Sequence, residues 1–129
     1  MSFLLQFFWF SVSGVLALLV DMAVLYLLKS SLGLYIARAF SFLCAVLTTW
    51  LFNRTMTFRQ YQSGYSLKKE FGIYLGLMMA GGLINYGVYA LLINQYAFIA
   101  AYPALGVAAG SIAGMLVNLC TAKFVLFRL

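Results

Sequence analysis

Apolar residues form four long runs along the chain, and short polar stretches separate them. The runs cover Phe7–Leu28, Leu34–Phe52, Phe71–Ile93 and Ala97–Cys120. A helix rises about 1.5 Å per residue, so each run is long enough to cross roughly 30 Å of hydrocarbon. The pattern therefore predicts an all-α membrane protein with four transmembrane helices.

Polar residues mark the expected connections between these helices. A turn at Ser30–Gly33 ends the first run, and Asn53 with Arg54 ends the second. The polar stretch Gln60–Glu70 predicts the loop between the two halves of the chain. Pro103 lies in the first turns of the fourth run, where a backbone N–H has no acceptor within the helix, so it is compatible with that helix.

The two halves of the chain resemble each other. When the first run is aligned on the third, Asp21 aligns with Asn85, and at the ends of the second and fourth runs Arg54 aligns with Lys123. Both halves begin on the same side of the membrane, so the repeats are parallel and not inverted.

This repeat predicts one domain over residues 1–129, built as two helical hairpins. Repeat 1 covers about residues 3–59 and repeat 2 about residues 71–129, with the loop 60–70 between them. We expect the hairpins to be related by an axis along the membrane normal.

The composition supports lipid surroundings. Hydrophobic residues make up 66% of the chain and charged residues only 8%, against about 25% charged residues in ordinary soluble domains. The net charge is +6, and the basic residues flank the apolar runs. Membrane lipids with anionic headgroups are therefore the expected partners, and nucleic acid is not.

The positions of the basic residues predict the orientation. Six lie on the side that holds both termini and the central loop: Arg54, Arg59, Lys68, Lys69, Lys123 and Arg128. Only Lys29 and Arg38 lie on the other side. Since Lys and Arg are enriched on the cytoplasmic side, both termini are expected in the cytoplasm.

Each half closes with a basic residue, a short apolar-rich stretch and Phe-Arg. The two motifs are Asn53-Arg54-x-x-Thr57-Phe58-Arg59 and Lys123-Phe124-Val125-Leu126-Phe127-Arg128. Together with Gly14 and Asp21 in the first run and the four-span layout, they make the whole chain resemble the GtrA-like family. The resemblance implies flipping of a polyprenyl-phosphate-linked sugar across the bacterial cytoplasmic (inner) membrane for cell-surface polysaccharide modification.

Cations near the helix ends are candidate ligands for the phosphate of such a lipid. Arg54 and Lys123 lie at equivalent cytoplasmic helix ends, although any such end also attracts Lys and Arg as anchors. Arg38 lies a few residues inside the opposite end of its helix, where it either receives the phosphate after translocation or pairs with Asp21.

Asp21 is the one acid within a predicted span. The functional interpretations are a proton-coupling group or a contact for the sugar head. The structural interpretations are an ion pair with Arg38 or Lys29, or a protonated acid hydrogen-bonded to Asn85.

Smaller polar residues predict a groove across the bilayer. Arg38, Ser41 and Thr48 fall on one face of the second helix, and we add Asn53 and Asn118 to the groove. The alternative is close packing, with the hydroxyl groups bonded to the preceding turn of their own helix.

Small residues recur at every fourth position in the second half. The positions are Gly106, Gly110 and Gly114 in the fourth helix and Gly76 in the third. Such spacing lets helix backbones approach closely, within one chain or between subunits.

The sequence contains no phosphate-binding loop, no histidine and no nucleophile constellation, so we expect neither an enzyme nor a metal or cofactor site. Four helices enclose little volume, which favours a homo-oligomer, most simply a dimer, with a membrane glycosyltransferase as a possible partner. Two other functions stay open: a small multidrug-type proton-coupled exporter, and a non-transporting scaffold for a glycosyltransferase.

Overall fold

The computed structural model describes residues 2–127, and Arg128 lies outside them. The described chain is helical throughout apart from short connections. It divides into two compact units, Met1–Gln62 and Ser63–Leu129, and the division falls within the predicted loop 60–70. We call these units the first and second hairpin.

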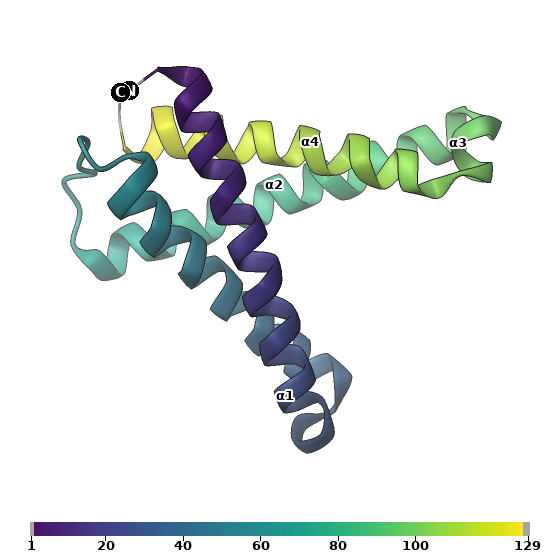
Figure 1. The fold of residues 1–129 in the computed structure, drawn as a ribbon, viewed down its shortest axis with the longest axis horizontal. Coiled ribbons are helices and arrows are strands. Elements are labelled where there is room, and N and C mark those ends of the chain that lie inside the picture. Colours follow the sequence, from purple (N-terminus) through teal and green to yellow (C-terminus); the bar gives the residue numbers. More distant parts are fainter. Residues whose placement is uncertain (1, 128–129) are drawn as a thin grey trace. The chain divides into compact units, whose positions relative to one another are not determined.

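The first hairpin consists of α1 (Phe3–Phe52) and the π-helix η1 (Asn53–Thr57). The label α1 covers two antiparallel helices, because the chain reverses at Gly33 (Figure 1). Gly33 has φ 81° and ψ 167°, a conformation that is essentially restricted to glycine. The predicted turn at Ser30–Gly33 therefore ends on the residue type that its backbone requires.

The second hairpin contains α2 (Leu67–Gln95), the short α3 (Ala97–Ala101), α4 (Pro103–Thr121) and the π-helix η2 (Ala122–Leu126). The helices α2 and α4 run side by side, and α3 lies at the end where they connect (Figure 1).

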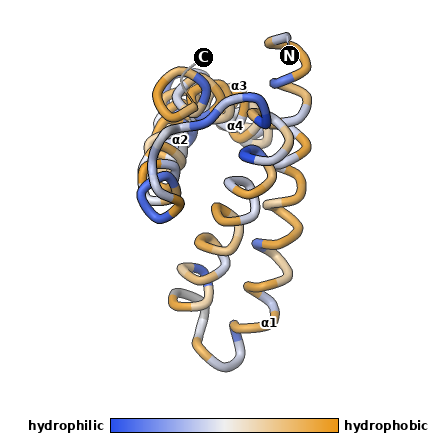
Figure 2. Tube along the Cα trace, turned by 90° about the vertical axis from the view of Figure 1, so that its left-hand side faces the viewer, coloured by the Kyte–Doolittle hydropathy of each residue, from blue (hydrophilic) through white to orange (hydrophobic). Residues whose placement is uncertain are grey.

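Four helices of the described chain are long and apolar enough to cross a membrane. They are Phe3–Gly33, Ile36–Thr57, Leu67–Gln95 and Ala104–Leu126. Many large apolar side chains on them are exposed, and Figure 2 shows hydrophobic residues along most of α1. The prediction of an all-α protein with four helices of membrane length is confirmed.

Several predicted boundaries are wrong. The second and fourth helices do not end at Phe52 and Cys120 but continue into the π-helices. The fourth run is not one helix, since non-helical dihedral angles at Tyr102 separate α3 from α4. The central loop is shorter than predicted, because Ser66 caps α2 with its side-chain oxygen and Leu67 already begins the helix.

The two hairpins share local features at matching positions. Ser2 and Ser66 cap the first helix of each hairpin, and each accepts a hydrogen bond from a backbone N–H three residues further on. Each hairpin also ends in a π-helix of five residues, at the positions that the sequence repeat aligns. The repeat is thus visible in the backbone of each unit.

Candidate functional site

Asp21 forms an ion pair with Arg38 inside the first hairpin. The Arg38 Nη1 donates to Asp21 Oδ1 at 2.5 Å, across the two helices of α1. The Asp21 side chain is 13% exposed and that of Arg38 58%, so the carboxylate is covered while the guanidinium reaches outward. Among the interpretations of Asp21, the structure presents the partnership with Arg38. Lys29 instead lies over the Tyr26 ring, with Nζ 4.2 Å from its centre.

The polar side chains of the predicted groove in the first hairpin form hydrogen bonds to nearby groups of their own helix. Ser41 is buried and donates to the Arg38 carbonyl at 3.0 Å, and Thr48 donates to the Cys44 carbonyl at 2.8 Å. Asn53 is buried and accepts from Thr57 Oγ1 at 2.7 Å. These contacts match the packing alternative, in which hydroxyl groups bond to their own helix.

Arg54 and Lys123 occupy the same position in the two π-helices. In each, a backbone bond of π type closes the helix end, from Phe58 N to Asn53 O at 2.8 Å and from Phe127 N to Ala122 O at 2.9 Å. Both cations are half-buried. Since π-turns are frequent at functional sites, the repeated pairing of such a turn with a cation marks this end of each hairpin.

Glycines allow α2 and α4 to touch. A Cβ at Gly114 would lie 2.8 Å from the Gly81 carbonyl oxygen, and a Cβ at Gly110 would overlap the Asn85 carbonyl. A Cβ at Gly81 would overlap the Asn118 side chain, which lies directly against this glycine. The structure therefore places this contact within one chain.

The other two glycines of the predicted packing set differ from Gly110 and Gly114. A Cβ at Gly106 would meet only side-chain atoms, the nearest being Tyr89 Cδ2 at 3.2 Å. A Cβ at Gly76 would have no described atom within 4 Å. Gly76 therefore makes no close helix approach within the described chain.

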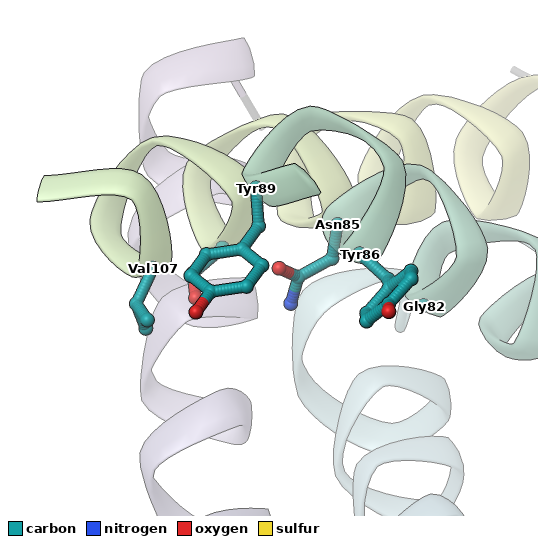
Figure 3. A pocket seen from close by; sticks show the side chains of 6 residues that line it. Gly82, Asn85, Tyr86, Tyr89 and Val107 are labelled. Carbon is teal, nitrogen blue, oxygen red and sulfur yellow. The ribbon is translucent and has the colours of Figure 1, made fainter. Parts of the chain in front are cut away.

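Asn85 lines an open groove of about 270 Å³ on one side of the second hairpin. Figure 3 shows Asn85, Tyr86 and Tyr89 extending from α2 to the same side, with Val107 facing them from α4. The full lining set is Gly82, Asn85, Tyr86, Tyr89, Val107 and Ser111. The groove therefore combines an amide, hydroxyl groups and aromatic rings, the mixture typical of small-ligand sites.

Comparison with known families decides the classification. The model of the family described as GtrA/DPMS, transmembrane domain, matches residues 9–127. The chain belongs to this GtrA/DPMS family. No curated protein and no solved structure is similar enough to count as a match.

The GtrA/DPMS match spans both hairpins, so it covers the Asp21–Arg38 pair, both π-helices and the groove. The residues that the sequence predicted to contact the substrate are divided between the two hairpins. The ion pair belongs to the first hairpin, and Asn85 and Asn118 belong to the second.

Two buried polar residues of this GtrA/DPMS chain were missed by sequence reasoning. Gln6 and Glu70 occupy matching places in the first turns of α1 and α2, and both are fully buried. Glu70 accepts a hydrogen bond from Ser63 Oγ at 2.7 Å, whereas the Gln6 amide atoms have no hydrogen-bond partner among the described residues. The sequence repeat could have identified them, because it aligns Gln6 with Glu70, each four positions after a capping serine.

Proposed function

We propose that the protein translocates a polyprenyl-phosphate-linked sugar across the bacterial cytoplasmic membrane, for modification of a cell-surface polysaccharide. Membership of the GtrA/DPMS family supports a role in sugar-lipid handling. The observation that carries the proposal is the cation in each π-helix, Arg54 in one hairpin and Lys123 in the other.

A lipid-linked sugar presents its phosphate at the membrane surface, and cations at that depth are its natural receptors. Arg can bind a phosphate through two parallel N–H groups, and Lys acts as a compact point charge. Both cations belong to helical turns, which hold them in place better than a mobile loop would.

In this proposal the phosphate first contacts Arg54 or Lys123 on the cytoplasmic side. The sugar head then crosses while the prenyl tail stays in lipid, and it leaves near the depth of Asp21, Arg38 and Asn85. The chain carries out no chemical step and holds no cofactor. A homo-oligomer, most simply a dimer, supplies enclosed volume, and a membrane glycosyltransferase is the expected user of the sugar.

The alternatives lead to different behaviour. A proton-coupled exporter needs an acid that is available to protons, and the pairing of Asp21 with Arg38 gives that function no support. A scaffold for a glycosyltransferase would move no lipid-linked sugar when reconstituted alone.

The proposal is tested by comparing Arg54→Ala with Arg59→Ala in liposomes that contain only this protein and a polyprenyl-phosphate-linked hexose. Each variant removes one charge, but Arg59 follows the π-helix and is exposed. We expect Arg54→Ala to slow translocation at least tenfold and Arg59→Ala to change it less than twofold. Equal effects at equal protein content would show that these residues act only as membrane anchors.

A further inference from the structure

The second hairpin carries a short helix, α3, that has no counterpart in the first hairpin. Before the connection of each hairpin, the repeat places Asn85 64 positions after Asp21. After the connection, it places Lys123 69 positions after Arg54. The connection of the second hairpin is therefore longer by five residues, and α3 has five residues. Since the first hairpin reverses at Gly33 without such a helix, α3 is not needed to close a hairpin and indicates an additional interaction.

Contacts with α2 and α4 fix the position of α3. A Cβ at Gly106 would lie 3.3 Å from Ile99 Cγ2 and 3.6 Å from Ile93 Cγ1, so Ile99 packs against α4 beside the end of α2. Next to Ile99, Phe98 is 67% exposed, and Tyr102 at the end of α3 is 60% exposed. The centres of these two rings lie 5.2 Å apart. The helix is thus held in place by the hairpin and presents an aromatic pair to its surroundings.

This aromatic pair belongs to an open groove of about 430 Å³, which we call the α3 groove. Its lining residues are Phe98, Tyr102, Ala104 and Leu105. Only Tyr102 has a polar side-chain atom, so the α3 groove offers apolar surface with a single hydroxyl group. We call residues 96–105, which include the α3 groove, the α3 corner.

The backbone of the α3 corner forms hydrogen bonds within the corner itself. Ala100 N donates to the Tyr96 carbonyl at 3.0 Å, Tyr102 N donates to the Phe98 carbonyl at 3.1 Å, and Leu105 N donates to the Tyr102 carbonyl at 3.0 Å. Lipid surroundings require that backbone polar groups be paired within the protein, whereas water would bond to them directly. The α3 corner therefore meets the condition for contact with lipid.

The connections at this end of the two hairpins differ in charge. Lys29 and Arg38 flank the turn of the first hairpin, and the Arg38 side chain is 58% exposed. The repeat places Ile93 at the position of the lysine, and the alignment of the π-helices, extended back without a gap, places Val107 at that of the arginine. Residues 94–102 contain no charge. An uncharged segment with exposed Tyr and Phe is typical of the membrane interface and not of a connection in water.

The length of α2 places the α3 corner at this depth. Residues 71–95, which follow the charged first turn of α2, rise about 37 Å at about 1.5 Å per residue. The hydrocarbon core is roughly 30 Å thick, so this length exceeds it even at the usual tilt of about 20°. The corner therefore reaches the membrane–water interface, where amphipathic aromatic rings are enriched.

We propose that the α3 corner binds a membrane phospholipid, with one acyl chain in the α3 groove. The apolar lining contacts the chain, and the hydroxyl groups of Tyr96 and Tyr102 lie among the headgroups. The bound lipid holds the second hairpin at a fixed depth in the leaflet that contains α3. This site is independent of the molecule that the protein carries across the membrane.

The test measures what surrounds a tryptophan introduced by Phe98→Trp. The two native tryptophans, Trp9 and Trp50, are replaced by phenylalanine. The matched comparison is Leu32→Trp, at an exposed position in the turn of the first hairpin. Each full-length variant is reconstituted in liposomes, and circular dichroism checks its helix content.

Two quenchers of tryptophan fluorescence are compared. One is phosphatidylcholine that is brominated in the upper part of its acyl chains, and the other is iodide present on both sides of the membrane. The α3 groove is then filled by adding Ala104→Phe to Phe98→Trp. Its control is Ala101→Phe, an exposed position on α3 outside the groove.

We expect the brominated lipid to quench Phe98→Trp at least threefold more strongly than Leu32→Trp, and iodide to show the reverse order. Ala104→Phe should lower quenching by the lipid at least twofold, and Ala101→Phe should leave it unchanged. Stronger quenching of Phe98→Trp by iodide would show that the corner faces water and would overturn the proposal. Protection from both quenchers would show that protein covers the corner, as in contact with a second copy, and would also overturn it. Equal effects of the two alanine substitutions would overturn the assignment of an acyl chain to the α3 groove.

Discussion

At the scale of single residues, Asp21 and Arg38 illustrate how a membrane helix accommodates charge. Each would be unfavourable alone at this depth, and together they form one neutral pair between two helices. In the second hairpin the repeat places Asn85 at the position of Asp21, and the alignment of the two π-helices, extended back without a gap, places Val107 at the position of Arg38, so this hairpin has no charge at either position. The pair is therefore one of two solutions to the same packing problem.

This comparison predicts how the pair responds to substitution. Asp21→Asn leaves Arg38 without its carboxylate and should lower the thermal stability of the protein in lipid nanodiscs. The loss in the free energy of unfolding should be smaller than the cost of roughly 2.5–3.5 kcal/mol for a charge at the bilayer centre, because the Arg38 side chain reaches outward.

The control is the double variant Asp21→Asn with Arg38→Val, which reproduces the residues of the second hairpin. The double variant should recover most of the lost stability, since replacing both partners of an ion pair destabilises a protein less than removing one partner does. A double variant that is less stable than Asp21→Asn alone would contradict this account.

At the scale of helices, small residues decide which surfaces meet. Gly81, Gly110 and Gly114 bring the backbones of α2 and α4 together, and this contact fixes the rotation of both helices. The rotation in turn directs Asn85 and Tyr89 to one side, where they form the groove. The packing of α2 against α4 and the groove are therefore consequences of the same contact.

Enlarging Gly114 should therefore weaken the second hairpin. In Gly114→Leu the new side chain meets the Gly81 carbonyl and the Asn85 Cβ, and we expect a loss of about 1–3 kcal/mol in the free energy of unfolding. Gly76→Leu should change it by less than about 0.5 kcal/mol, as surface substitutions do. Denaturant unfolding of the purified variants measures both values, and equal losses would show that α2 and α4 do not pack through Gly114.

Much of the helical layout could be predicted from the sequence, because hydrophobic length and the turn at Gly33 follow directly from residue types. The two π-helices could not be predicted from the sequence. They depend on a shift in backbone hydrogen bonding, and the hydropathy of residues such as Asn53 gives no information about that shift. The groove escaped prediction because Tyr86 and Tyr89 count as apolar residues in a hydrophobic run. Their hydroxyl groups matter only once the contact between α2 and α4 has set their direction.

At the scale of the whole molecule, the distribution of charge predicts the topology. Six of the eight basic residues lie near the C-terminus or around the segment between the hairpins, which should place these parts, and with them the N-terminus, in the cytoplasm. Single cysteines introduced at Gln62 and at Gln95, in a chain with Cys44 and Cys120 replaced by serine, give a direct measurement. A membrane-impermeant thiol reagent added to intact cells should label position 95 and spare position 62, and the reverse pattern would contradict the predicted orientation.

Translocation of a sugar lipid by this chain alone is the central claim. The most direct measurement uses sealed liposomes that contain the purified protein and a polyprenyl-phosphate-linked glucose in both leaflets, with periodate outside as an impermeant oxidant. With the protein, oxidation should proceed beyond the outer-leaflet share, roughly half of the lipid, towards completion, and without the protein it should stop at that share. Oxidation that stops at the same share in both samples, with correctly folded protein, would contradict the claim.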